Sequence, residues 1–119
     1  MRGHASRGGI VKEIDYSAAA IKDLEQIGDY IAERLYNPQA AFNTVNKIQD
    51  AIDKLADFPL MGSSLSSITG IKTDYRFLVC GNYLVFYRPL ENKTLIIRII
   101  YGRRDYIGIL FGNIRRDDE

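Results

Sequence analysis

The spacing of apolar residues predicts helices in the first half of the chain and strands in the second. Residues 10–16 alternate between apolar and polar positions, which favours a short strand. Ser17 can cap the helix that follows, because its hydroxyl oxygen accepts a hydrogen bond from a free backbone N–H. Beyond Ser17, apolar residues recur at intervals of three and four and so share one stripe of a helix. They are Ile21, Leu24, Ile27, Ile31 and Leu35.

A second helix is predicted after Tyr36. Asn37 suits the cap position, and Pro38 suits the first helical turn, where its missing N–H costs nothing. Pro59 should end the helix. Between these prolines the apolar residues recur at intervals of four and three, at Ala41, Val45, Ile48, Ile52 and Leu55. Because the link between the two helices is short, we expect them to form an antiparallel hairpin.

The second half of the chain changes to a strand pattern. Residues 60–74 are rich in serine and glycine, lack an apolar period and predict a long loop. Residues 75–101 follow as three largely apolar runs that predict strands. Gly81-Asn82 and Glu91-Asn92 would form the turns between them. This order predicts an α+β fold, in which a helical hairpin packs on one face of a four-stranded sheet that ends in a three-strand antiparallel meander.

The two turns also predict which strand residues share a face of the sheet. If both are two-residue turns, Arg76 lies opposite Tyr87, and Val85 lies opposite Arg98. The more apolar face should meet the helices, leaving Arg76, Tyr83, Tyr87 and Arg98 on an uncovered face. Guanidinium groups beside tyrosine rings suit phosphate and base contacts. Alternatively, Arg98 pairs with a carboxylate from the helices, since burying it unpaired is costly, and the tyrosines are ordinary half-buried sheet residues.

Length and composition place the chain among single-domain proteins. With 119 residues and 46 % hydrophobic content, it suits one folded core. Residues 10–112 would form this domain. They follow a basic, glycine-rich leader at 1–9 that is disordered or vector-derived, and they precede a loose tail at 113–119. No apolar run reaches the roughly 18 residues of a membrane span. The single cysteine fits a reducing compartment, so we expect the protein in the cytoplasm.

Charge is distributed unevenly between the two halves of the chain. Residues 12–59 hold 5 Lys or Arg against 9 Asp or Glu, whereas residues 60–113 hold 7 against 3. The net charge of the whole chain is only +1. The basic half could therefore attract a nucleic acid or an acidic partner. A plainer interpretation is that the helices carry solvated acids and the strands a few arginines.

The segment Gly102-Arg103-Arg104-Asp105 stands directly after the last predicted strand. The glycine would release the chain from the sheet, and the aspartate could cap a short terminal helix or pair with an arginine. Arg103 and Arg104 would extend the positive surface. The only histidine is His4, and Cys80 has no second thiol or nearby histidine, so we expect no metal site and no cofactor.

Two segments resemble the RelE/ParE superfamily of bacterial toxins, namely "NYLVFYR" at 82–88 and "RIIYGRRDYIGILF" at 98–111. The likeness extends over about residues 10–112 and is closer to the ParE-like branch. The resemblance implies a growth-inhibiting toxin of a type II toxin–antitoxin module, the kind known from plasmid stabilisation as an addiction module. It also implies a cognate antitoxin that neutralises the toxin and supplies any contact with operator DNA.

The resemblance implies different residues for the two activities found in this superfamily. RelE-like members cut mRNA on the ribosome without a metal, and Arg76, Arg104 and Tyr106 would then be the catalytic residues. The middle-strand arginine and the C-terminal tyrosine of these ribonucleases fall here on Tyr83 and Leu110. ParE-like members inhibit DNA gyrase by protein contact and need no catalytic set.

The two departures from the ribonuclease pattern favour gyrase inhibition. Tyrosine, with a reference pKa near 10, is a poor base, and no histidine is available within the fold. Ribosome-dependent mRNA cleavage is the alternative, and a nucleic-acid-binding module without chemistry is a third interpretation. The residues expected to bind the target are Arg76, Tyr83, Tyr87, Arg98, Arg103 and Arg104.

Overall fold

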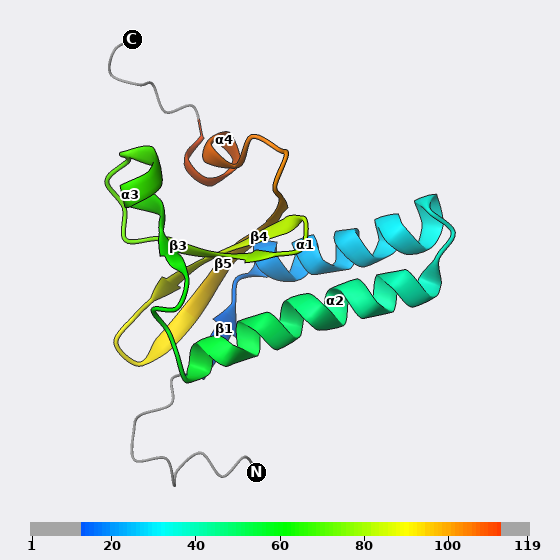
Figure 1. The fold of residues 1–119 in the computed structure, drawn as a ribbon, viewed down its shortest axis with the longest axis horizontal. Coiled ribbons are helices and arrows are strands. Elements are labelled where there is room, and N and C mark those ends of the chain that lie inside the picture. Colours follow the sequence, from blue (N-terminus) through cyan, green and yellow to red (C-terminus); the bar gives the residue numbers. More distant parts are fainter. Residues whose placement is uncertain (1–12, 113–119) are drawn as a thin grey trace, which may run out of the picture.

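The computed structural model describes residues 13–112 and places a central sheet between a helical hairpin and two short helices (Figure 1). The sheet separates two apolar clusters, one under the hairpin and one under the short helices. The predicted leader at 1–9, the first residues of the strand expected at 10–16, and the tail at 113–119 lie outside the described residues.

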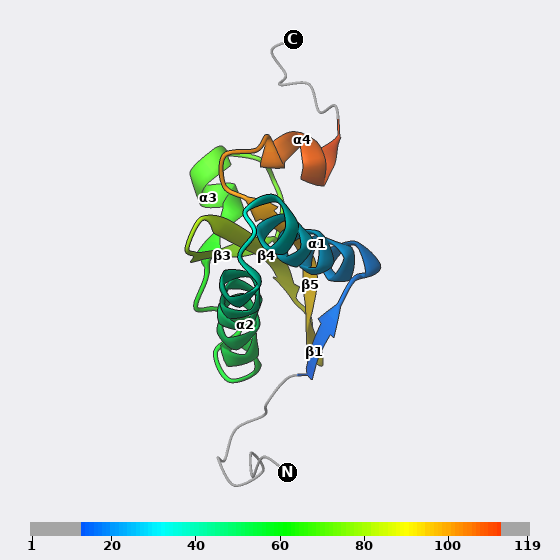
Figure 2. The same ribbon diagram turned by 90° about the vertical axis from the view of Figure 1, so that its right-hand side faces the viewer.

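The sheet has five strands in the order β1-β5-β4-β3-β2. Strand β1 runs parallel to β5 at one edge, which Figure 2 shows from the side, and the other neighbours are antiparallel. The fifth strand, β2, comes from the segment predicted to be a loop, so the four-stranded prediction falls one strand short. The strands are β1 Glu13–Tyr16, β2 Ser63–Ser64, β3 Arg76–Cys80, β4 Tyr83–Pro89 and β5 Lys93–Tyr101.

The helical hairpin forms as the sequence predicts. Helix α1, Ala18–Asp29, begins at Ser17, whose Oγ accepts a hydrogen bond from the N–H of Ala20. It continues into a π-helical turn at Tyr30–Arg34. Helix α2, Pro38–Asp53, begins at Asn37, whose side chain accepts from the N–H of Ala40, and it ends in a 3₁₀ turn at Lys54–Ala56. Both predicted caps are therefore confirmed.

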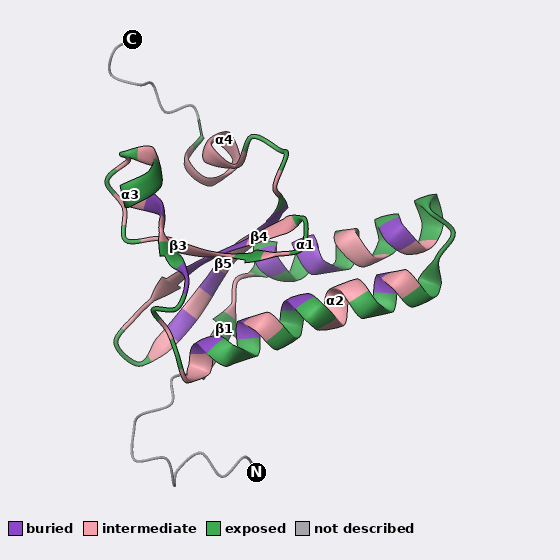
Figure 3. Cartoon of the chain, in the orientation of Figure 1, coloured by how far each residue is buried: buried purple, intermediate pink, exposed green. Residues whose placement is uncertain are grey.

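The hairpin packs against the sheet through one stripe of each helix, where the buried positions gather (Figure 3). From the helices this core takes Ala20, Leu24, Ile48, Ile52 and Leu55. From the strands it takes Val85, Tyr87, Ile96 and Ile99. The face containing Tyr87 is thus the face that the helices cover, opposite to the prediction.

A β-bulge explains part of this error. The turn at Glu91-Asn92 has two residues as expected, since Pro89 lies opposite Thr94. The register then shifts at the step between Phe86 and Tyr87, and this shift adds one residue to β5. Val85 therefore faces Ile99 and not Arg98, which instead lies opposite Phe86. The bulge moves every later residue of β5 to the other face.

The second face of the sheet is covered too. Helix α3, Leu65–Thr69, and helix α4, Tyr106–Phe111, pack there around Phe86 and Ile100. The expectation of an uncovered face is therefore wrong, because strands that are apolar on both sides need a cover on both. Among the described residues, no helix is long and apolar enough to cross a membrane.

Candidate functional site

The segment after β5 forms a tight turn that ends at helix α4. The N–H of Gly102 donates to the carbonyl of Asn82 (2.8 Å), which ties the end of β5 to the β3–β4 turn. The N–H of Arg104 donates to the carbonyl of Tyr101 (3.0 Å). A carboxylate oxygen of Asp105 accepts from the N–H of Gly108 (3.1 Å) and caps α4. The turn and the predicted cap are both confirmed.

Two hollows flank this turn and share Asn82 and Tyr101 in their linings. The first, here called the sheet-end groove, lies between the hairpin and the end of the sheet, has a volume of about 680 Å³ and includes Arg104. The second, the opposite cleft, has a volume of about 340 Å³ and includes Arg103 and Tyr106. The two adjacent arginines thus line different hollows.

The sheet-end groove combines three tyrosines with an apolar wall. The rings of Tyr83 and Tyr101 lie 5.8 Å apart, and the guanidinium of Arg34 lies 5.7 Å from the ring centre of Tyr30. Burial raises the pKa of Tyr83, and the nearby Tyr101 and Tyr30 raise it further. Its hydroxyl therefore stays protonated and can donate a hydrogen bond. The apolar wall comes from the hairpin and consists of Ile27, Ile31 and Leu35.

Arg98 is held inside the fold by Asp23 of α1. Its Nε and Nη2 atoms donate to the two carboxylate oxygens at 2.8 and 2.9 Å, and the N–H of Ile99 donates to the same carboxylate at 2.8 Å. The hydrogen bond to Asp23 raises the pKa of Arg98 above its usual value despite partial burial. Since Asp23 is only 8 % exposed, this is the structural pairing weighed as the alternative for Arg98.

Arg76 and Tyr87 fasten the segment after α2 to the sheet. Arg76 Nη2 donates to the carbonyl oxygens of Leu60 (3.1 Å) and Gly62 (2.6 Å). The N–H of Gly62 donates to the hydroxyl of Tyr87 (3.0 Å), whose side chain is completely buried. A Cβ at Gly62 would lie 2.5 Å from the carbonyl oxygen of Phe77, so only glycine fits. Arg76 and Tyr87 therefore contribute contacts within the chain.

The structure does not bring the three conditional catalytic residues together. Arg76 lies opposite Tyr87, four residues along β4 from Tyr83, or roughly 13 Å from the sheet end. Tyr106 lies on the other face of the sheet from the hairpin, with its ring 5.5 Å from that of Phe86. Only Arg104 lines the sheet-end groove. Leu110, where the resemblance to the ribonucleases implies a tyrosine, packs in the apolar cluster under α4.

The two arginines of the turn are the positively charged residues that line the two hollows. Both are exposed, and among the described residues neither takes part in an ion pair. Within residues 13–112, no cluster of three or more His, Cys, Asp or Glu could hold a metal ion. The site therefore offers guanidinium and tyrosine groups for contact.

The lining residues of the sheet-end groove that were not predicted to bind the target include Tyr30, Asn82 and Tyr101. Tyr30 had a detectable signal, because it lies three residues after Ile27 and at the edge of the apolar stripe of α1. No feature of the sequence indicates that Tyr101 belongs to the groove, because it is the bulge that places Tyr101 opposite Tyr83 and on the same face.

Comparisons with known proteins identify the family. The model of the family described as "ParE toxin of type II toxin-antitoxin system, parDE" matches residues 14–106. The chain is similar to a solved structure of the chromosomal ParDE system from P. aeruginosa, with TM-score 0.66 and 20 % identity over 78 % of this chain and 98 % of that one. It is also similar to a chain of the E. coli DinJ–YafQ toxin–antitoxin complex, with TM-score 0.52 and 18 % identity over 87 % and 100 %. No curated protein matches it. The two structures share the fold, and the family match over most of the chain shows that it belongs to the ParE toxin family of type II toxin–antitoxin systems.

Proposed function

We propose that this protein is a growth-inhibiting toxin that inhibits DNA gyrase by protein contact through the sheet-end groove. The observation that carries the proposal is an open groove with an unpaired arginine and three tyrosines, but without an assembled acid–base set. Tyrosine and arginine are the residues most enriched in the energetically dominant parts of protein interfaces. The apolar wall of the hairpin supplies the area that such anchors need.

Inhibition by contact with a target protein fits the chemistry of the site better than RNA cleavage does. Attack by a 2′-hydroxyl needs a base, an acid and positive charge at the phosphate. The side chains of Arg76 and Arg98 already donate hydrogen bonds within the chain, and the raised pKa of Tyr83 keeps its hydroxyl protonated and unable to act as the base. The described residues contain no histidine to replace it. Arg104 remains as the single cation of the groove.

We further propose that a cognate antitoxin binds and neutralises this toxin in the cytoplasm, and that it supplies any contact with operator DNA. The two similar structures described above come from toxin–antitoxin systems, one named ParDE and the other DinJ–YafQ. An exposed groove lined by tyrosines and an arginine is costly to leave open, since it attracts non-specific partners. An antitoxin that covers it would explain the neutralisation.

Ribosome-dependent mRNA cleavage is the second candidate, and the opposite cleft favours it. Arg103 and Tyr106 line that cleft together, and an arginine beside an aromatic ring suits a phosphate and a stacked base. Under this alternative the two hollows at the sheet end would contact one RNA strand that passes the turn. A nucleic-acid-binding module without chemistry would use the same cleft.

The test is to induce the chain in a bacterium that lacks the antitoxin, and to measure plasmid supercoiling and mRNA 5′ ends in the same culture. Gyrase inhibition predicts relaxed plasmid and intact messages before growth stops. Codon-phased mRNA cuts with normal plasmid supercoiling would contradict gyrase inhibition and support the ribonuclease activity. Continued growth at full expression would exclude both toxin activities and leave only the interpretation as a nucleic-acid-binding module without chemistry. Co-expression of the proposed cognate antitoxin should restore growth under either toxin activity.

A further inference from the structure

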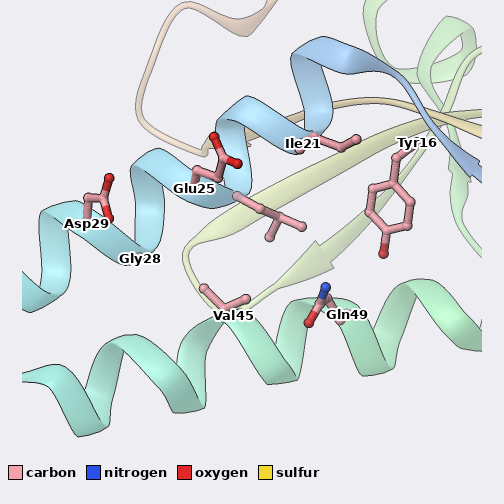
Figure 4. A pocket seen from close by; sticks show the side chains of 8 residues that line it. Tyr16, Ile21, Glu25, Gly28, Asp29, Val45 and Gln49 are labelled. Atoms are coloured by element: carbon pink, nitrogen blue, oxygen red, sulfur yellow. The ribbon is translucent and has the colours of Figure 1, made fainter.

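A third hollow runs along the hairpin itself, between α1 and α2 (Figure 4). This interhelical groove has a volume of about 470 Å³ and shares no lining residue with the sheet-end groove. In Figure 4, Tyr16 and Gln49 point into the space between the helices, whereas Glu25 and Asp29 stand on α1 at the rim. It is therefore a second surface, separate from the one proposed to contact the target.

The floor and walls of the interhelical groove are apolar. Leu24 and Val45 line it from the two helices, and Ile21 at its edge is 49 % exposed. The two helices lie close together at Gly28, where an added Cβ would lie 3.4 Å from a methyl carbon of Val45, which is an ordinary van der Waals contact. An exposed isoleucine above a shallow apolar channel is surface that a partner can bury favourably.

The rim of the same groove is acidic and uncompensated. Glu25 and Asp29 are exposed and lie four residues apart on α1, where two like charges repel each other. No lining residue is a lysine or an arginine, and among the described residues neither acid forms an ion pair. Asp53 adds a third negative charge near Tyr16, since burial and Asp53 together raise the pKa of that tyrosine to about 12.

We propose that the interhelical groove binds a basic amphipathic helix of a partner protein. A third helix fits between two antiparallel helices, with its apolar stripe on Ile21, Leu24 and Val45. Lysine or arginine residues at positions i and i+4 of that helix would match the spacing of Glu25 and Asp29. The negative rim repels nucleic acid and acidic segments. The inference does not depend on the gyrase proposal, because the two surfaces are separate.

The binding test uses a model peptide, because the chain contains no tryptophan and a peptide tryptophan can be observed without background. The probe is a Leu/Lys amphipathic helix of about 14 residues, or roughly 21 Å, with one tryptophan on its apolar face. The comparison probe replaces every lysine by glutamate. We expect the Leu/Lys peptide to bind with a blue shift of its tryptophan emission, and the Leu/Glu peptide to remain free.

Matched variants of the full chain locate the binding. Glu25→Gln/Asp29→Asn should weaken the binding of the Leu/Lys peptide roughly fivefold at low salt, because it removes two exposed ion pairs with the peptide. Glu33→Gln/Asp50→Asn removes two exposed acids that do not line the groove, so it carries the same net charge and should leave the affinity unchanged. Ile21→Ala should weaken binding several-fold by removing part of the apolar wall.

Three results would overturn the proposal. Equal weakening by the two double variants would mean general charge attraction with no groove. Equal binding of the Leu/Lys and Leu/Glu peptides would remove the role of the acidic rim. A second copy of the chain seated in the groove would appear as a dimer that Ile21→Ala converts to monomer without any peptide. Circular dichroism of each variant ensures that a lost affinity is not lost folding.

Discussion

Two pairs of arginines in this protein differ in what they contact, although the sequence places all four in or beside the sheet. Arg76 and Arg98 donate hydrogen bonds to carbonyl and carboxylate oxygens of the same chain. Arg103 and Arg104 follow the last strand, are exposed and form none of the ion pairs of the described region. The difference separates residues that hold the fold from residues available to a target.

The largest effect expected from this comparison is functional. Arg104→Ala should abolish growth arrest, because it removes the single cation of the sheet-end groove. It should change the free energy of unfolding by less than about 0.5 kcal/mol, as exposed residues without partners do. Colony counts after induction and a urea titration measure the two quantities.

Arg103→Ala is the matched control, because it removes the same charge one residue away. If the opposite cleft is not the target surface, this variant should still arrest growth. Loss of toxicity in Arg103→Ala with full toxicity in Arg104→Ala would reverse the assignment of the two hollows.

Removing the partner of an inner arginine should have the largest effect on stability. Asp23→Ala leaves Arg98 and the N–H of Ile99 without their acceptor, so unfolding should become easier by about 3 kcal/mol or more. Urea denaturation of the purified variant measures this value. Asp74→Ala breaks the exposed pair with Arg88 and should cost less than about 1 kcal/mol. Similar costs for the two variants would contradict the structural role of Arg98.

The hydroxyl groups of two sheet tyrosines should show the same contrast at a smaller scale. Tyr87→Phe removes the acceptor of the buried Gly62 N–H and should destabilise the protein by about 1–2 kcal/mol. Tyr83→Phe changes a hydroxyl at the sheet-end groove and should cost less than about 0.5 kcal/mol. Thermal unfolding compares them. An equal loss in both would mean that Tyr83 also holds the fold.

The smallest effect concerns Tyr16, whose pKa is raised to about 12 by burial and then by Asp53. Because the folded protein holds this proton more tightly than the unfolded chain, its contribution to stability is complete below pH 10. It is then lost as the pH rises toward 12. Tyr16→Phe should make the stability fall less steeply over this window. Parallel curves for variant and wild type would show that the hydroxyl is solvated.

Local signals in the sequence predicted most of the hairpin and the three-strand meander. Ser17, Asn37 and Asp105 each accept the backbone hydrogen bond expected of a cap. These contacts join residues three apart, so nearby residues decide them. The tight turn at Gly81-Asn82 is equally local and brings Cys80 opposite Tyr83 as predicted. Such features depend little on the rest of the chain.

The faces of the sheet were not predictable in the same way. Both faces of the meander are apolar, and Tyr87, which was expected on an uncovered face, has a buried ring and a hydrogen-bonded hydroxyl. The bulge opposite Phe86 has no glycine or proline to mark it, and its one extra residue places Arg98 opposite Phe86 and Ile99 opposite Val85. The short elements β2 and α3 were not predicted, because segments of two to five residues are too short to show a period of apolar residues.

The most direct test of the central claim measures supercoiling by purified DNA gyrase in the presence of the purified toxin, in a reaction that contains no ribosome and no mRNA. Contact through the sheet-end groove predicts that the wild type inhibits supercoiling, that Arg104→Ala does not, and that Arg88→Ala inhibits as the wild type does. Full gyrase activity at excess wild-type toxin, together with codon-phased mRNA cleavage on added ribosomes, would contradict the account.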